Sequence, residues 1–279
     1  MKLRFVLLLL FINFNTFSNS IDSLNIVINN MFNAIDKLKS LKYVLRNIER
    51  IDGTLLIGEQ YVKLLKLPRK CYILMLKPVQ GAEVLYIEGK NNNLAIYNPN
   101  AFPYFKLNLD TYGSLMRKNN HHTIHEMGFD YIKSILHFLY TNDKNVFKYD
   151  GVKMIVGKAY YKITVTIPNY SNEIYCFDKN ETVISVARKN KISEYKILEL
   201  NPNIDDFSYG IEGKNILIPN FYAKKLELYI DKNNFMPIIQ NIYDEKGLFE
   251  KYEYQKLEVN PIFFEKDFSS EYLGNNNPK

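Results

Sequence analysis

The order of the elements in residues 174–219 constrains the fold of this chain more than any other feature. An apolar strand at Ile174–Phe177 precedes two short amphipathic helices, and a second apolar strand at Ile216–Ile218 ends at Pro219. Apolar residues at i, i+3 and i+4 mark the first helix, and the second stops at Asn201-Pro202 because proline resists helical continuation. The sequence therefore predicts a small βααβ unit within a longer chain.

This unit resembles a LysM domain, a βααβ module that binds glycans containing N-acetylglucosamine. The resemblance rests on Ile174-Tyr175-Cys176-Phe177, on Asn180-Glu181-Thr182-Val183 and on the closing run Gly213-Lys214-Asn215-Ile216-Leu217-Ile218-Pro219. The family's usual Gly-Asp-Thr-Leu stretch is Asn180-Glu181-Thr182-Val183 here, so its loop glycine is absent. Asparagine tolerates a left-handed backbone better than most residues, which limits the effect of this departure.

The LysM resemblance implies a glycan groove between two loops, at 178–184 and at 201–206. The binding residues that it implies are Asn180, Glu181, Thr182, Val183, Asn201, Pro202, Asn203 and Ile204. The structural alternative is that Thr182 only caps the first helix and that Asn201 only ends the second. If the groove binds glycan, this segment holds the protein on peptidoglycan.

The first 20 residues are typical of a secretory signal peptide. Residues 1–4 carry two positive charges, residues 5–14 are almost wholly apolar, and small residues lie at Ser18-Asn19-Ser20. The apolar stretch is short for a bilayer-spanning helix, and an uncleaved N-terminal anchor is the alternative. No later stretch is long and apolar enough, so we expect an exported, periplasmic protein whose mature chain has no transmembrane segment.

Charge and cysteine content narrow the partners further. The formal net charge is +6, or +4 without Lys2 and Arg4, and the positive residues are scattered. Because no basic stripe is present, we expect no nucleic-acid partner. Cys71 and Cys176 could form one disulfide in an oxidising compartment, but they fall on different predicted units, which favours two buried free thiols.

The rest of the chain has the pattern of helices plus an antiparallel sheet. An apolar stripe at helical spacing runs from Leu24 to Leu38, with Asp22 or Ser23 as its cap, and a second helix covers Phe129–Tyr140. Strand-like runs lie at Leu41–Arg50, Gln60–Leu67, Lys70–Leu76, Ala82–Glu88, Leu94–Tyr97, Val152–Val156, Tyr160–Ile167, Lys225–Ile230, Pro237–Asp244 and Leu248–Leu257. The run Lys70–Leu76 is apolar on both faces, as in a sheet curled around helices or an apolar cavity, and Ile73 and Met75 are the candidate cavity residues.

This order resembles the lipoprotein and lipid carriers with the LolA-like fold. More narrowly, it is similar to a family of exported proteins of unknown function from Gram-negative bacteria. The matching runs are Pro78–Tyr86, Leu115–Ile124 and Asp231–Tyr254. The resemblance implies an α+β fold, with an open antiparallel β half-barrel, covering helices and an apolar cavity.

Three parts are therefore expected. They are a signal peptide at 1–20, a discontinuous half-barrel domain at 21–170 plus 223–279, and an inserted LysM domain at 171–222. The insert would carry Tyr195 and Leu198 in its own core. Because the ends of a βααβ unit lie close together, it can occupy a surface turn of the host and unfold independently.

Catalytic and metal-binding motifs are absent from the sequence. It contains no Gly-x-Ser-x-Gly elbow and no His-Glu-x-x-His. His121, His122 and His125 lie close together, but no cysteine or tight carboxylate cluster completes a metal site. Hydrogen bonds that hold a loop are the expected role of these histidines. We expect no catalytic residue, no metal and no cofactor.

The sequence thus predicts a non-enzymatic, wall-associated binding protein of the periplasm. The insert would dock on peptidoglycan or another N-acetylglucosamine glycan. The barrel would hold a hydrophobic ligand, either a lipid or the acyl part of a lipoprotein. The alternatives are a wall-active hydrolase and a structural adaptor with a filled core. An apolar cavity favours the binding protein, and a cleft with convergent carboxylates favours the hydrolase.

Overall fold

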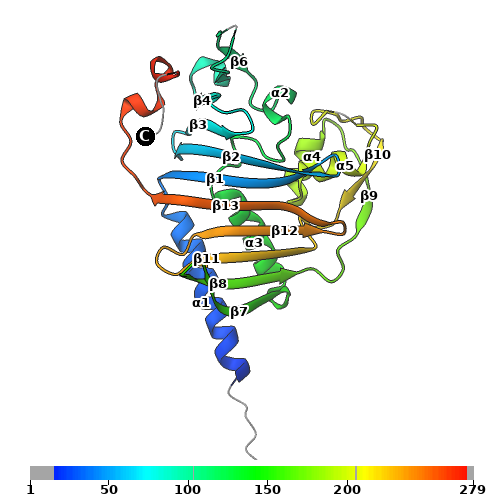
Figure 1. Ribbon diagram of the computed structural model, residues 1–279. Helices are drawn as coiled ribbons and strands as arrows, with labels where there is room; N and C mark the ends of the chain where they lie inside the picture. The colour runs from blue at the N-terminus through cyan, green and yellow to red at the C-terminus, as the bar shows by residue number, and fades with distance from the viewer. Residues whose placement is uncertain (1–15, 103, 205, 275–279) are drawn as a thin grey trace, which may run out of the picture.

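The computed structural model describes residues 16–102, 104–204 and 206–274 (Figure 1). Most of the predicted signal peptide lies outside the described residues. Helix α1 (Thr16–Asp36) runs through Asp22 and Ser23, so neither residue caps it as predicted. Its apolar stripe, which includes Ile28 and Met31, is buried. None of the helices in the described part of the chain combines the length and the apolar character that crossing a bilayer needs.

The body of the described chain is an antiparallel sheet of 11 strands. In spatial order the strands are β6 (Leu107–Leu109), β5 (Ala95–Asn98), β4 (Glu83–Ile87), β3 (Lys70–Lys77), β2 (Thr54–Leu65), β1 (Ser40–Ile51), β13 (Gly247–Val259), β12 (Pro237–Asp244), β11 (Lys225–Asp231), β8 (Lys158–Thr166) and β7 (Phe147–Ile155). The helical segments of the host besides α1 are α2 (Ser114–Arg117), α3 (Asp130–Asn142), η1 (Asn91–Asn93), η2 (Lys144–Val146), η3 (Glu265–Phe268) and η4 (Ser270–Tyr272). In the middle of the sheet, β1 from the N-terminal part of the chain pairs with β13 from the C-terminal part, with Leu41 opposite Val259.

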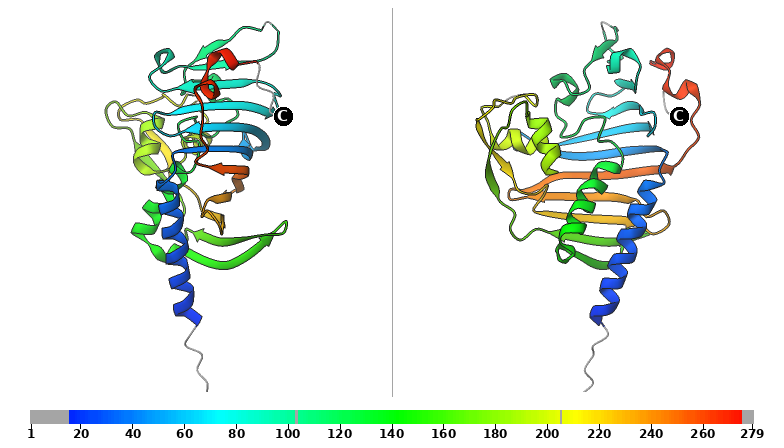
Figure 2. Two further views of the ribbon diagram at one scale, coloured as in Figure 1. Left: turned by 90° about the vertical axis from the view of Figure 1, so that its left-hand side faces the viewer. Right: turned by 180° about the vertical axis from the view of Figure 1, so that it is seen from behind.

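Helices cover one face of this sheet, and the C-terminal segment covers part of the other (Figure 2). The buried residues of α1 and α3 join the main core on the concave face. On the opposite face, Phe268 and Leu273 of the C-terminal segment pack on Tyr72 and Leu74 of β3. Since Ile73 faces the main core, β3 is apolar on both faces because both are covered.

The α+β class and the large open antiparallel sheet agree with the prediction. Strand β6 was not predicted, and β2 and β7 begin earlier than predicted. The first residues of β2 are exposed and lack apolar alternation, and a register shift between Tyr149 and Val152 interrupts the pattern of β7.

The segment between β8 and β11 folds in the predicted order of strand, helix, helix and strand. Its elements are β9 (Asn172–Cys176), α4 (Val183–Asn190), α5 (Glu194–Leu200) and β10 (Asn215–Pro219), with β9 paired to β10. Its own core consists of Phe177, Val183, Val186, Ala187, Ile192, Ile197, Ile204, Ile216 and Ile218. Because β8 and β11 pair directly, with Thr166 opposite Lys225, this insert emerges from one hairpin of the host sheet. Its identity as a LysM domain stays a prediction.

The two cysteines are free, and only one of them is buried. Cys71 is buried, and burial raises the pKa of its thiol to about 12. Cys176 is exposed, so the prediction of two buried thiols is wrong at this position. The cause is the alternation of β9, where Tyr175 packs toward the insert's core and Cys176 therefore faces away.

Candidate functional site

A cavity of about 720 Å³ lies between the concave face of the sheet and the segment 110–128, which connects β6 to α3. Its wall is mainly apolar and comes from β1 to β6, β12, β13, α3, the connecting segment and Tyr222. Ile73 and Met75, the two residues proposed from sequence, both line it, as do Tyr43 and Val84. The volume is within the range of about 300–1,000 Å³ that is usual for small-molecule sites.

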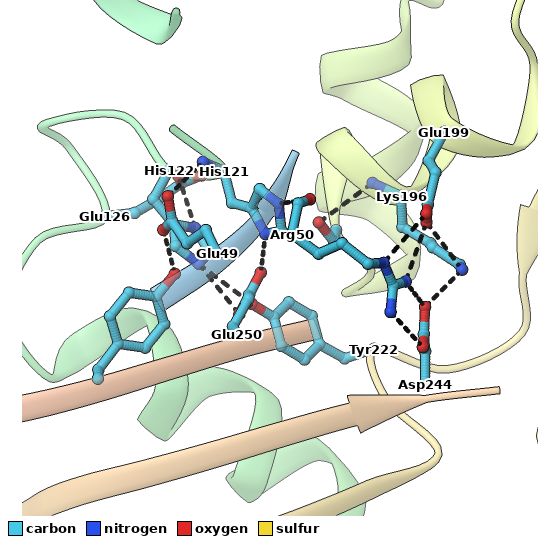
Figure 3. Close-up of polar contacts among 12 residues, drawn as sticks. Glu49, Arg50, His121, His122, Glu126, Lys196, Glu199, Tyr222, Asp244 and Glu250 are labelled. Carbon is cyan, nitrogen blue, oxygen red and sulfur yellow. Dashed lines mark hydrogen bonds and ion pairs between the residues drawn. The ribbon is translucent and has the colours of Figure 1, made fainter. Parts of the chain in front are cut away.

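Two buried carboxylates lie side by side at this wall. Glu49 of β1 and Glu250 of β13 are cross-strand partners and are 3% and 0% exposed. Like charges placed directly opposite each other destabilise a sheet, so both need partners. The Tyr252 hydroxyl donates to Glu49 Oε1 (2.5 Å), and the Tyr222 hydroxyl donates to Glu250 Oε2 (2.8 Å). His121 joins the two, since its backbone N–H donates to Glu49 Oε2 and its Nδ1 lies 2.8 Å from Glu250 Oε1 (Figure 3).

His122 lines the cavity and adds a positive charge to this group. Its Nδ1 lies 3.2 Å from Glu126 Oε2, and its Nε2 lies 3.2 Å from the Tyr222 hydroxyl oxygen. Because Tyr222 already donates to Glu250, both ring nitrogens of His122 act as donors. Burial lowers the pKa of His122, but Glu250 and Glu126 together raise it well above its ordinary value. For Glu250 the directions are reversed. Burial raises its pKa, but the positive charge of His122 and the hydrogen bond from His121 lower the pKa overall.

We call these residues, Glu49, His121, His122, Glu126, Tyr222, Glu250 and Tyr252, the wall network. Its members bond to one another and so satisfy one another's polar atoms. Within the described ranges, no group of three or more His, Cys, Asp or Glu side chains is placed to hold a metal ion. His121, His122 and His125 make side-chain hydrogen bonds, as the sequence predicted for the loop histidines. Sequence reasoning missed Glu250, although its alternation with Tyr252 and Tyr254 on β13 puts it on their face.

The segment 110–128 also packs against the insert and stabilises its position. Arg117 and Glu194 form an ion pair whose side chains are only 1% and 3% exposed. The Arg117 guanidinium lies 3.3 Å from the centre of the Phe207 ring. Tyr195 of α5 stacks on His121, with 4.2 Å between ring centres. The insert therefore contacts the wall network at His121, and Arg188 of α4 adds an ion pair with Glu126 at 3.8 Å.

A second group of charges fixes α5 to the end of the host sheet. Asp244 is 2% exposed at its side chain and pairs with both Arg50 and Lys196, whose Nζ lies 2.7 Å from Asp244 Oδ2. Glu199 completes the group, at 3.0 Å from Lys196 and 3.3 Å from Arg50 (Figure 3). Since Tyr195 packs on the host, its predicted place in the insert's own core is wrong. This buried polar interface favours joint unfolding over the predicted independent unfolding.

The predicted glycan-binding residues lie in the two loops, but several are engaged within the insert. Val183 and Ile204 are buried in its core. Thr182 caps α4, because its hydroxyl accepts from the Ser185 N–H (3.2 Å) and the Ser185 hydroxyl accepts from the Thr182 N–H (2.8 Å). The Val183 N–H donates to the Tyr209 carbonyl (2.9 Å), so the chain after α5 covers the start of α4.

Glu181 and Asn201 are engaged in the same way. Glu181 accepts from the Tyr175 hydroxyl and from Lys189 Nζ, and the hydrogen bond from Lys189 lowers the pKa of Glu181 to about 2. Asn201 ends α5, as the structural alternative states, and its side chain bonds to the backbone of β10. Asn180, Pro202 and Asn203 remain exposed, and Asn180 adopts the left-handed backbone with φ of 62°.

The fold and the cavity define a mixed α+β protein with a large open antiparallel sheet and helices over one face. The chain belongs to the DUF1571 family, described as a protein of unknown function, because the family model matches residues 38–195. This match extends from the start of the host sheet into α5 of the insert. No curated protein matches the chain significantly.

Solved structures resemble the chain only in general fold. MucB is 11% identical, with a TM-score of 0.40, and the match covers 89% of this chain and 63% of MucB. The Mycobacterium tuberculosis lipoprotein LppX is 16% identical, with a TM-score of 0.43 and coverage of 87% and 98%. A LolA superfamily protein from Nitrosomonas europaea is 11% identical, with a TM-score of 0.34 and coverage of 89% and 98%. These similarities are too low to carry an argument about function.

Proposed function

We propose that the protein is a non-enzymatic binding protein of the periplasm that holds a hydrophobic ligand, a lipid or a lipoprotein acyl chain, in the cavity. The observation that carries this proposal is the cavity of about 720 Å³ with its mainly apolar wall. Such a space favours a binding protein over a structural adaptor with a filled core. The lining carboxylates Glu49 and Glu126 bond to Tyr252 and His122, which argues against a hydrolase with free convergent carboxylates.

The wall network favours entry of the ligand with its apolar end first. Glu49, His122 and Glu126 already have partners, so an apolar chain in the cavity displaces no required contact. Each methylene group that leaves water for such a site contributes about 0.8 kcal/mol. Several methylene groups of the ligand therefore supply most of its binding free energy, and the polar end of the ligand stays at the solvent-exposed end of the cavity.

Two neighbouring residues of β3 test the role of the cavity. Met75 and Leu76 are both half-buried, but Met75 lines the cavity, whereas Leu76 packs on the opposite face. Met75→Lys is expected to weaken uptake of a fluorescent fatty acid by about tenfold or more, because it places an unpaired ammonium in an apolar site. Leu76→Lys adds the same charge outside the cavity and is expected to leave uptake nearly unchanged.

The measurement is a fluorescence titration without vesicles, with circular dichroism to show that each variant is folded. An equal loss in both folded variants would contradict the cavity as the binding site. A folded wild type that takes up no apolar probe would remove the proposal altogether.

We also propose that the insert docks the protein on peptidoglycan through the exposed side chains of its two loops. The order strand, helix, helix, strand and the separate core support this. Deleting the insert is a poor test, because Tyr195 and Tyr222 belong to contacts with the host. Substitution of exposed loop residues leaves those contacts in place.

The double variant Asn180→Gly, Asn203→Ala is expected to reduce co-sedimentation with insoluble peptidoglycan severalfold. Glycine keeps the left-handed backbone at position 180. Binding by the wild type should be weak, because a single module has no avidity. Asn172→Ala, at an exposed position of β9 outside the loops, is the matched control. Equal pelleting of the wild type and the double variant would exclude the two loops as the glycan site.

A further inference from the structure

Exposed apolar side chains surround one end of the cavity. Five residues line the cavity and also face solvent, with exposed fractions between 36% and 68%: Leu56, Ile57, Val79, Leu107 and Leu115. We call these five residues the mouth rim. They come from β2, the turn between β3 and β4, β6 and α2, so separate parts of the chain converge there. Large apolar residues that gather in this way on a surface mark an interaction site.

An aromatic segment lies next to the mouth rim in the sequence, outside the cavity. Phe102, Tyr104 and Phe105 are 87%, 73% and 54% exposed, and they precede Leu107 in the connection from β5 to β6. None of the three lines the cavity. Exposed aromatic rings next to apolar side chains are typical of the interface between a membrane and water.

Three exposed lysines lie at or beside the mouth rim. Lys77 and Lys118 line the same end of the cavity and are exposed, and Lys106 lies in the aromatic segment. Glu59 also lines the cavity, and its carboxylate lies 3.1 Å from Lys77 Nζ. The lining acids Glu49 and Glu126 belong to the wall network. Lysines beside apolar side chains match the surface of a membrane, where anionic headgroups lie over an apolar acyl layer.

We propose that the mouth rim and the aromatic segment dock on a lipid bilayer with anionic headgroups. Docking brings the open end of the cavity against the acyl layer, so that a chain passes between bilayer and cavity without crossing water. The inference rests on the proposed function for its purpose, but docking itself is measured separately from ligand uptake. Lys77 and Lys118 contact phosphate groups, while the rim enters the headgroup region.

Flotation with lipid vesicles tests this docking. The wild type is expected to float with vesicles of phosphatidylcholine plus phosphatidylglycerol, and less with phosphatidylcholine alone. Phe102→Glu, Phe105→Glu is expected to lower flotation by about tenfold, because two exposed aromatic anchors become charged. Val152→Glu, Met154→Glu is the matched control, since these exposed apolar residues lie far along the sheet on β7. All variants share one N-terminus, so its contribution is common to them.

The outcomes test bilayer docking separately from ligand uptake by the cavity. Phe102 and Phe105 do not line the cavity, so the aromatic variant should still take up a fluorescent fatty acid from solution. Lost flotation with retained uptake supports bilayer docking. Equal flotation of the aromatic and control variants overturns it, as does capture of a protein partner by a chain that never floats. A wild type that floats but takes up no probe removes the proposed function and leaves docking standing.

Discussion

Replacing Glu250 with glutamine is expected to lower the free energy of unfolding by about 3–5 kcal/mol, the usual effect of removing one partner of a buried ion pair. The carboxylate is 0% exposed and receives hydrogen bonds from Tyr222 and from His121. Without it, the positive ring of His122 keeps only Glu126 as a close counter-charge. Chemical denaturation of the wild type and the variant measures the difference.

Glu253→Gln on the same strand is the matched control. The Glu253 side chain is 20% exposed and pairs with Arg46 and Lys251. Ion pairs that water reaches contribute about 0–1 kcal/mol, so the control should lose much less stability than Glu250→Gln. Equal losses in the two variants would contradict a special role for the wall network.

The Glu250 substitution is also expected to change how stability depends on pH. The pKa of Glu250 is lowered in the folded protein, so its carboxylate stabilises the fold above the unfolded value of about 4.3, and this contribution is lost as pH falls through the folded pKa. The pKa of His122 is raised, so its contribution is present below about 6.5 and is lost as pH rises through the folded pKa. Glu250→Gln should flatten the acid limb and lower the pKa of His122 in an NMR titration. An unchanged titration of His122 would show that the two groups are not coupled.

Replacing Glu194 with glutamine is expected to destabilise the insert and the host together, by about 3–5 kcal/mol. Arg117 is 1% exposed at its side chain and would lose its buried partner. Because α5 contacts the host through this pair and through Lys196 with Asp244, we expect calorimetry to show one transition that shifts as a whole. Leu198→Ala, beside the core of the insert, should shift the same transition.

An apolar pair provides the control for this interface. Burial raises the pKa of Glu194 in spite of Arg117, which indicates that the charges are incompletely compensated. Arg117→Met with Glu194→Leu should therefore recover most of the stability lost in the single variant, since apolar replacement of a buried pair is often neutral or stabilising. Two separate unfolding transitions, of which Glu194→Gln shifts only one, would show that the insert and the host unfold independently.

Most of the secondary structure could be predicted because it rests on local pattern. Short runs of residues contain the turns at Asp231 and Asp244 and the alternation of β11 to β13. The predicted apolar face of α3 is buried at Ile132, Leu136 and Leu139, together with its N-cap residue Phe129. The two-faced apolarity of β3 predicted a strand beside helices or a cavity, and Ile73 and Met75 do line the cavity, but cover of the other face by Phe268 and Leu273 was not predicted.

The wall network and the interface could not be predicted because they join distant residues. Glu49 and Glu250 meet only through the pairing of β1 with β13, and Tyr195 meets His121 only when the insert folds back on the host. A short amphipathic helix shows which of its positions are apolar, but not that its polar side has a buried partner. In α5 the polar residues Glu194 and Lys196 are both buried against the host, each with its own partner.

The pairing of β1 with β13 has a consequence for how the protein is made. Arg46 bonds to Glu253 across 207 positions of sequence, and this seam lies in the middle of the sheet. A ribosome releases β1 long before β13, so the sheet stays in two halves until synthesis is nearly complete, and pairing at such separation is slow. The wall network needs both strands, so the wall of the cavity can be completed only after β13 has been synthesised, close to the end of translation.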